Sequence, residues 1–585
     1  MTAQLGTPSF VELFTPKLVT VLRERYRAAD FKADFVAGLT VAIVALPLSM
    51  AIAIASGVPP ERGLYTAIVG GFIVSALGGS RFQIGGPAGA FIVLVLATVQ
   101  QFGLEGLILA TLISGVMLMA IGFLRLGTFI KYIPYPVTVG FTAGIAVIIF
   151  SGEIRDLLGL QIEGQEPGPL VEKLGVLYAA LPSVNASAVA VALFSLAVIL
   201  LTRKYKPHWP GLLIAVALGA LLAWGMALPV ETIGSRFGGI PQAFPMPMLP
   251  TLSVGKVLEV LPSAVSFALL GSIESLLSAV VADSMTGRRH RSNCELVAQG
   301  VANIGSALFG GFCVTGTIAR TATNVRAGGR TPIAGMTHSV LLLGFMLIAA
   351  PLMSYIPLAT LAAVLAVVAW NMAEKHEFAN LLRASWSDAV VLMSTFLLVI
   401  FRDLTEGIVV GFSISALVFL HRMAQSVKVE RPMVEEDAAD GASARVPYEG
   451  KLAVDRDIAI YRISGAFFFG AAASVSAVLE RIGQSPRAYV IDLSEVFELD
   501  STAAATIASL AQRAERQGAS VRISGASVAV RRILLGQGAR PPLVIYETSL
   551  TDAVAAARAE LGHSPAPEMQ PQDVSAPSAE GHASP

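Results

Sequence analysis

Long apolar stretches separated by short polar loops run from residue 35 to residue 422 of this 585-residue chain. A membrane-spanning helix needs about 20 mostly apolar residues. Two of the apolar stretches, near residues 86 and 317, are short and are interrupted by glycine or proline. The pattern predicts a polytopic α-helical membrane protein with about fourteen transmembrane segments, at 35–56, 62–79, 86–101, 104–124, 134–154, 185–202, 211–229, 261–282, 295–311, 317–328, 333–351, 357–373, 388–401 and 405–422.

The pattern changes after residue 423. "IAIYRISGAFFFG", "AYVIDLSEVFELD" and "SVRISGA" are typical of strands, and "STAAATIASLAQRAERQG", "SVAVRRILLGQG" and "TDAVAAARAELG" of helices. This alternation predicts a small soluble α/β domain. The expected organisation is a cytoplasmic N-terminal segment at 1–33, a transmembrane transport domain at 34–423, a polar linker at 424–450, the α/β domain at 451–562 and a disordered tail at 563–585.

The distribution of charge supports this organisation and adds an orientation. Charged residues make up 14% of the chain, mean hydropathy is +0.68 and the net charge is zero, so no nucleic-acid partner is indicated. Lys and Arg concentrate in alternate loops, for example at 203–206 and 288–291. By the positive-inside rule, these loops and both termini lie in the cytoplasm, and the protein is expected in the inner (plasma) membrane.

The two interrupted stretches resemble each other. "GGSRFQIGGPAGAF" (78–91) follows the first two segments, and "GGFCVTGTIARTAT" (310–323) follows the eighth and ninth. Each begins with Gly-Gly at a helix end, crosses about six residues and enters a short helix. Corresponding broken segments in the two halves of a transporter indicate its binding site, since non-helical backbone at membrane depth must be covered by protein or line a cavity.

Such a pair of helix starts is suited to an anion. The first turn of each short helix has N–H groups without intrahelical partners, and the helix dipole places partial positive charge there. Gly89 and Gly316 would let an anion approach the backbone, and the Thr317 hydroxyl and Arg320 would add donors. The alternative is that the glycines serve only close helix packing.

These residues carry a family resemblance. "DFVAGLTVAIVALPLSMAIAIASGVPPERGLYTAIVGG" and "ARTATNVRAGGRTPIAG" resemble signatures of the sulfate permease (SulP) family of anion transporters, and the C-terminal domain resembles the STAS domain. The resemblance implies a 7+7 inverted repeat, in which segments 1–4 and 8–11 form a core and the others a gate. It also implies a homodimer and an anion site between the half-helices of segments 3 and 10. The positions that it implies for substrate binding are Ser49, Pro87, Ala88, Gly89, Thr317, Ala319 and Arg320, with Pro47 and Leu48 lining the cavity beside Ser49.

Glu274 is a single carboxylate in the apolar stretch 261–282. A carboxylate in that setting either pairs with a cation, for which Arg320 is the nearest candidate, or takes up a proton. We expect it to couple transport to protons; the alternative is that it only pairs with Arg320 or with backbone N–H groups of segment 10. Some sodium-coupled bicarbonate members of the family carry Asp and Thr where this chain has Glu274 and Ser278, so proton coupling is favoured over sodium coupling.

The α/β domain contains "ELDSTAAAT". In anti-sigma factor antagonists, which this domain resembles, a serine after the Asp is phosphorylated at the start of a helix. Ser501 occupies that position, although Ala503 replaces the usual glycine, so Ser501 is a candidate regulatory phosphosite. Plain N-capping by Asp500 or Ser501 is the preferred interpretation.

Several functions are not indicated. The chain has no GxxxxGK[ST] loop, no HExxH and no paired-cysteine zinc spacing, so we expect no cofactor, no metal and no enzymatic activity. His338, alone in an apolar span, is expected to be packed or hydrogen-bonded, and Cys294 and Cys313 are not expected to form a disulfide framework.

The leading hypothesis is a secondary active transporter of small anions of the sulfate, C4-dicarboxylate or bicarbonate class, working as a proton symporter.

Two alternatives are kept. One is a membrane-anchored signalling protein in which the STAS domain is the working part; the two broken half-helices argue against it, because an anchor needs none. The other is a proton-coupled nucleobase carrier of the same fold. That alternative predicts a second carboxylate on segment 10, where this chain has Arg320 and threonines.

Overall fold

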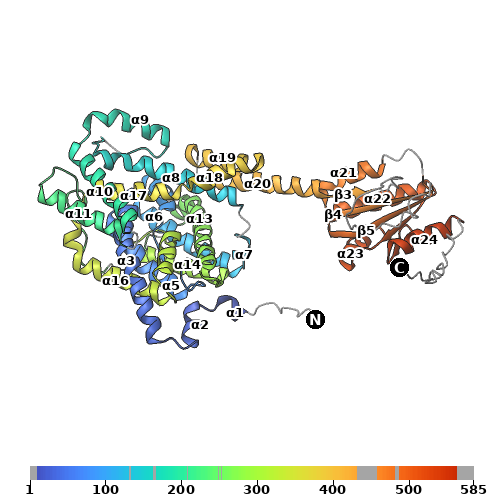
Figure 1. Cartoon of the computed structure of the whole chain (residues 1–585), viewed down its shortest axis with the longest axis horizontal. Coiled ribbons are helices and arrows are strands. Elements are labelled where there is room, and N and C mark those ends of the chain that lie inside the picture. Colours follow the sequence, from blue (N-terminus) through green and yellow to red (C-terminus); the bar gives the residue numbers. More distant parts are fainter. Residues whose placement is uncertain are drawn as a thin grey trace, which may run out of the picture. The chain divides into compact units, whose positions relative to one another are not determined.

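The computed structural model describes residues 10–130, 134–162, 166–206, 209–244, 246–247, 249–251, 253–402, 404–430, 457–480 and 486–562. The chain divides into two compact units, Met1–Ser415 and Ala416–Pro585 (Figure 1). The predicted tail at 563–585 and residues 431–450 of the predicted linker lie outside the described residues.

The first unit is a bundle of helices (Figure 1). Each of the fourteen predicted segments is helical over most of its length, and in the described residues eight helices are long and apolar enough to cross a membrane. The protein is a polytopic helical membrane protein. The segments are α3 (Ala28–Ala55), α4 (Pro60–Tyr65) continued by a π-turn at Thr66–Gly70 into α5 (Gly71–Leu77), the 3₁₀ turn η2 (Gly89–Phe91) continued by α6 (Ile92–Phe123), α8 (Tyr135–Leu158), α10 (Ala186–Tyr205), α11 (Gly211–Gly225), α13 (Val254–Thr286), α14 (Ser292–Leu308), α15 (Ile318–Arg326), α16 (Ile333–Met353), α17 (Leu358–Met372), α19 (Trp386–Phe401) and α20 (Leu404–Ser426).

Segments 3 and 4 join at Gly103, which interrupts α6 with a φ of 67°. This left-handed conformation favours glycine, and it lies between the predicted ends of the two segments. Short helices that the hydrophobic pattern did not predict lie between the spans: α1 (Phe10–Phe14), α2 (Lys17–Arg23), α7 (Gly127–Ile130), α9 (Leu170–Ala180), α12 (Ile233–Phe237) and α18 (Lys375–Ala384).

The membrane helices pack in two groups. In the first group α6 packs against α13 and α14, and α3 packs against α16. In the second, α8 packs against α17 and α19, and α10 packs against α11 and α17. The first group contains segments 1–4 and 8–11, as the inverted-repeat fold requires. We call the two groups the core helices and the gate helices.

The two interrupted stretches meet inside the core helices. Strand β1 (Gly85–Gly86) pairs antiparallel with strand β2 (Thr315–Gly316), with Gly85 opposite Gly316 and Gly86 opposite Thr315. Helix η2 begins three residues after β1, and α15 begins two residues after β2. The pairing satisfies backbone groups that a broken helix would otherwise leave without partners at membrane depth, and it places the two helix starts side by side.

The second unit contains a five-stranded sheet of order β3–β4–β5–β6–β7. Strands β4 (Ile458–Phe467), β5 (Ala488–Leu499), β6 (Ser520–Ser524) and β7 (Ile545–Glu547) are parallel, and β3 (Lys428–Glu430) is an antiparallel edge strand. One apolar cluster packs α21 (Phe469–Glu480), α22 (Ser501–Arg516) and α23 (Val528–Gly536) on one face of the sheet, and another packs α24 (Leu550–Glu560) on the opposite face. Strand β3 lies in the stretch that was expected to be linker.

Candidate functional site

At several positions the two broken segments lie so close together that there is no room for a side chain. A Cβ atom on Gly86 would lie 2.1 Å from Nη1 of Arg320, and one on Gly316 would lie 1.7 Å from Nε2 of Gln83. Beside the strands, the backbone N–H of Thr317 donates to the carbonyl of Ile84 at 3.0 Å. The glycines therefore serve the close approach of the two segments and of the Arg320 side chain.

Arg320 is the central charge of this region and is 2% exposed. Its Nη2 donates to Ser49 Oγ at 3.1 Å and to the Pro87 carbonyl at 3.3 Å. Its Nε and Nη1 are buried and have no hydrogen-bond partner among the described residues, where Arg320 also forms no ion pair. An uncompensated buried charge costs several kcal/mol, so this guanidinium offers strong electrostatic stabilisation to an anion.

The other predicted substrate positions surround this guanidinium. Ser49 lies in α3 just after Pro47, and its hydroxyl donates to the Ala45 carbonyl at 2.7 Å while accepting from Arg320. Pro87 and the buried Ala88 precede η2, which begins at the partly buried Gly89. The structure therefore brings Ser49 of segment 1 and Pro87 of segment 3 onto the Arg320 side chain of segment 10.

The start of α15 supplies the backbone part of the site. Thr317 is its N-cap, and the Thr317 hydroxyl makes no capping bond but donates to the Ile84 carbonyl at 3.3 Å. Ala319, in the first turn, is exposed. The first N–H groups of a helix have no intrahelical acceptor. The first turn of α15 therefore offers backbone N–H donors and partial positive charge at the residues just before Arg320.

Glu274 lies on α13, half-buried, and makes no ion pair or hydrogen bond with any described residue. The alternative interpretation, in which Glu274 only pairs with Arg320 or with backbone N–H groups of segment 10, is therefore wrong for this conformation, because Arg320 is directed at Ser49 and Pro87. Within the described part of the chain, Glu274 thus has no cation paired with it.

A ladder of polar side chains around β1 and β2 was not predicted. Gln83 Nε2 donates to Ser275 Oγ at 2.8 Å, Ser278 Oγ donates to Thr321 Oγ1 at 3.0 Å, and Thr321 Oγ1 accepts from the Ile84 N–H at 3.1 Å. These bonds fix α13, which carries Glu274, to both broken segments. The sequence held a signal for them, since serines 272, 275 and 278 recur every three residues along one helix face.

The remaining candidates lie apart from this site. In the second unit, Asp500 is the N-cap of α22 and accepts from the Ala503 N–H at 2.8 Å, while Ser501 is exposed. His338 is packed inside the first unit, and neither of its ring nitrogens has a partner among the described residues. Cys294 and Cys313 are buried free thiols.

Comparison with known proteins gives a consistent result. Residues 31–395 match the model of the sulfate permease family, and residues 451–548 match that of the STAS domain. The chain is 39% identical to the putative sulfate transporter YvdB of Bacillus subtilis, over 86% of this chain and 92% of that protein. It is 30% identical to the bicarbonate transporter BicA of Picosynechococcus, over 86% of this chain and 90% of that one.

A solved structure shares the fold along almost the whole length. The murine Solute Carrier 26 family member A9 anion transporter, in the inward-facing state, matches with a TM-score of 0.82 at 20% sequence identity, covering 95% of this chain and 96% of that chain. With its two paired half-helices and its C-terminal sheet, this chain belongs to the sulfate permease family of transporters and carries a STAS domain.

Proposed function

We propose that this protein is a secondary active transporter of small anions of the sulfate, C4-dicarboxylate or bicarbonate class, working by alternating access. The observation that carries the proposal is the buried Arg320 guanidinium, which has no carboxylate partner among the residues described and lies at the start of a half-helix. The relatives named for sulfate and bicarbonate transport support the class of substrate.

The anion is held by Arg320 and by the two helix starts. Nε and Nη1 of Arg320 carry three N–H donors for which the described residues provide no acceptor. The first turns of η2 and α15 add backbone N–H groups, and Gly89 leaves room beside the first of them. Such a site selects negative charge without an inorganic counter-ion. Movement of the core helices against the gate helices would then expose it to either side of the membrane.

Transport is coupled to protons through Glu274. In the part of the chain that the structure describes, this carboxylate has no ion-pair or hydrogen-bond partner. A proton on Glu274 offsets one unit of the negative charge that an anion brings beside Arg320, so each favours the binding of the other. This thermodynamic linkage is what symport requires. The presence of Glu274 and Ser278, in place of the Asp and Thr of sodium-coupled relatives, supports protons as the coupled ion.

The assembly and its orientation belong to the same proposal. Lys and Arg in alternate loops support cytoplasmic termini in the inner (plasma) membrane, and we expect a homodimer.

The test of function is uptake by the purified full chain in liposomes, with labelled sulfate, bicarbonate and succinate offered separately, with and without an inward proton gradient. Saturable uptake of one anion that the gradient drives above equilibrium is the expected result. No uptake of any anion, with protein correctly inserted, would contradict the proposal.

A further inference from the structure

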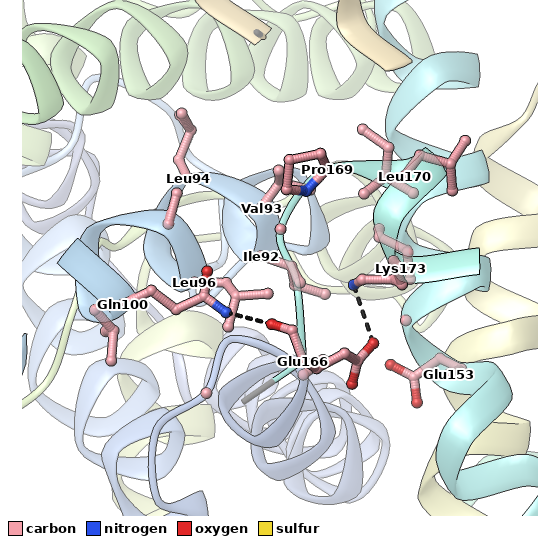
Figure 2. A pocket seen from close by; sticks show the side chains of 18 of the residues that line it. Ile92, Val93, Leu94, Leu96, Gln100, Glu153, Glu166, Pro169, Leu170 and Lys173 are labelled. Atoms are coloured by element: carbon pink, nitrogen blue, oxygen red, sulfur yellow. Dashed lines mark hydrogen bonds and ion pairs between the residues drawn. The ribbon is translucent and has the colours of Figure 1, made fainter. Parts of the chain in front are cut away.

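A large cavity in the first unit has balanced charges. It measures about 760 Å³ and lies between the core helices α3 and α6 and the gate helices α8 and α19. Figure 2 shows Glu166 paired with Lys173 on its wall, with Glu153 nearby. Its lining carries four cations and three carboxylates, and one of the cations, Arg402, pairs with Glu406 at 3.3 Å. These charges therefore favour neither a cation nor an anion.

A second cavity, of about 440 Å³, has a surplus of positive charge. Four stretches of the chain form it: the residues from α2 to the start of α3, the loop before β1, the loop after α13 and the loop after α15. Its charged lining residues are the arginines Arg25, Arg81, Arg288 and Arg330 and the carboxylates Glu24 and Asp30. The fold thus brings together arginines that are far apart in the sequence.

Two of these four arginines are already paired. Nη2 of Arg81 donates to both carboxylate oxygens of Glu24, at 2.5 and 2.7 Å. Nη1 of Arg330 donates to Oδ1 of Asp30 at 2.9 Å. Because these pairs use both carboxylates of the lining, the other two arginines have no negative partner in it.

Arg25 and Arg288 are the surplus cations. In the part of the chain that the structure describes, neither guanidinium makes an ion pair or a hydrogen bond. The hydrogen bond from Arg81 lowers the pKa of Glu24, and the charge of Arg288 acts in the same direction, so Arg288 lies close to this carboxylate. Arg25 follows α2 with a φ of 65°, a left-handed conformation that is costly for this residue type. Costly backbone conformations cluster at functional sites.

Charged groups just outside the lining offset one another. Asp34 accepts a hydrogen bond from the lining residue Tyr26 at 2.9 Å. Asp283 and Arg291 both act electrostatically on Lys17, which lies in α2. These groups comprise two carboxylates and two cations, so they leave the surplus of the cavity unchanged.

We infer that this second cavity binds a phosphomonoester dianion, with the phosphate group held by Arg25 and Arg288. The surplus of two positive charges matches the charge of such a phosphate, about −1.5 to −2 at neutral pH. Guanidinium groups bind phosphate oxygens through pairs of parallel hydrogen bonds. The volume is within the range of about 300–1,000 Å³ that is typical of sites for small organic molecules, so the ester body has room beside Tyr26 and Phe82.

The ligand would fasten the N-terminal segment to the core helices. Arg25 lies between α2 and α3, and Arg288 follows α13. Phe82 leads into β1, and its carbonyl accepts from Nδ2 of Asn324 in α15 at 2.8 Å. In the orientation proposed above, this side faces the cytoplasm, so the phosphate could belong to a soluble ester or to phosphatidic acid in the inner leaflet.

The first test measures binding by thermal unfolding. The full chain is heated in detergent with increasing glycerol 3-phosphate at constant ionic strength. Wild type should show a saturable rise of the unfolding midpoint, and Arg320→Met should keep this rise, which separates it from the transport site. In the Arg320→Met background, Arg25→Asn combined with Arg288→Gln should weaken binding at least about tenfold, the loss expected for hydrogen bonds to a charged group.

The substitutions are chosen to keep the fold. Asn tolerates the left-handed conformation at position 25, so Arg25→Asn removes the charge without added strain. The matched control is Arg289→Gln, which changes an exposed arginine next to Arg288 that does not line the cavity. It should bind glycerol 3-phosphate as wild type does. Wild-type affinity in the variant that lacks both Arg25 and Arg288 overturns the inference.

Hydrogen exchange locates the ligand in the wild-type protein. Glycerol 3-phosphate should slow the exchange of backbone amides at 17–30 and 286–291, because it holds these stretches together. Neutral glycerol and zwitterionic glycerophosphocholine should slow neither stretch. Protection by glycerol equal to that by its phosphate ester would show that the charge has no role and would also overturn the inference.

Nanodiscs distinguish the two sources of the phosphate group. The full chain is placed in phosphatidylcholine, with or without phosphatidic acid, and the same amides are followed. Protection by phosphatidic acid without any soluble ester assigns the site to a lipid headgroup. Protection by glycerol 3-phosphate, with none from phosphatidic acid, assigns it to a soluble ester. Protection by neither means that the cavity does not bind a phosphomonoester.

Discussion

The guanidinium of Arg320 is a buried cation whose Nε and Nη1 have no acceptor among the described residues. Arg320→Met keeps a long side chain and removes the charge. Replacing an uncompensated buried charge by an apolar group is neutral or stabilising, so the variant without ligand should unfold at the same or a higher temperature than wild type. Anion affinity should fall by about 10- to 100-fold, the loss expected for hydrogen bonds to a charged group.

The matched control is Arg326→Met, at an exposed position on the same helix. It should leave both the unfolding midpoint and the stabilisation by added anion as in wild type. Calorimetry or fluorescence-detected unfolding with increasing sulfate or bicarbonate measures both quantities. An Arg320→Met protein that still binds the anion with wild-type affinity would show that the site lies elsewhere.

Glu274 can be tested separately from anion binding. Glu274→Gln mimics the protonated side chain, so it should bind the anion at least as well as wild type, and binding should depend less on pH. It should lose accumulation driven by an inward proton gradient, since the residue that carries the proton is gone. Glu259→Gln, at an exposed position on the same helix α13, is the control. Liposomes with Glu274→Gln that still concentrate the anion when the outside is acid would exclude coupling through this residue.

At the scale of secondary-structure elements, the pairing of β1 with β2 leaves no room at Gly86. A Cβ there would lie 2.1 Å from Nη1 of Arg320, so Gly86→Ala should displace the guanidinium and abolish anion binding in a protein that still inserts. Gly89 differs, because its Cβ would meet Met372 Sδ at 3.4 Å and Ile149 Cδ1 at 3.5 Å, which are ordinary contacts. Gly89→Ala should therefore bind nearly as wild type, and Gly89→Trp should not bind.

Anion-dependent shifts of the unfolding midpoint check this series, with gel filtration to confirm a folded protein. Gly255→Ala, where an added Cβ meets nothing within 4 Å, is the control for a glycine substitution in a helix. If Gly86→Ala binds the anion like wild type, the contact between the first broken segment and Arg320 is not needed for the site.

Some of the secondary-structure elements could be predicted from the sequence, and others could not. The fourteen segments were predictable because a membrane span must be long and apolar, and the two breaks because glycine-rich backbone is rare at membrane depth. The ladder from Gln83 to Ser275 was not, since its partners are 192 positions apart and single polar residues carry no pairing signal. Strand β3 was missed because its alternation, with one half-buried side chain between two exposed ones, extends over only three residues.

The contacts of the charged side chains were predicted less well than the helices and strands. The Arg320 position was identified from its place after the second break, and its partners Ser49 and Pro87 only from the family resemblance. The ion pair with Glu274, which was the alternative role for that carboxylate, does not form. The ion pair between Lys173 and Glu166 was missed entirely. Lys173 lies on α9, a short helix outside the apolar spans, so hydropathy gave no reason to bring it next to a membrane helix.

At the scale of the whole molecule, the question is what the STAS domain contributes. The candidate anion site lies entirely within Met1–Ser415, whereas the sheet of the second unit begins at β3, Lys428–Glu430. A cut at residue 450 would leave β3 in the membrane fragment without its partner β4 and expose an edge. A cut after Ser426, at the end of α20, separates complete elements and is the better boundary.

The protein truncated after Ser426 should insert, and anion should still raise its unfolding midpoint as in wild type, because Arg320 and both half-helices are retained. We expect its uptake of anion in liposomes to fall several-fold, since the STAS domain would then no longer support the assembled carrier. Ser501→Asp in the full chain tests regulation separately: it places negative charge at the N-terminus of α22 without removing the domain. If truncation changes neither the uptake rate nor the oligomeric state measured by light scattering, the domain is neither structural nor regulatory for transport. A truncated protein that no longer responds to anion would instead mean that the site depends on the second unit, contrary to the geometry of Arg320.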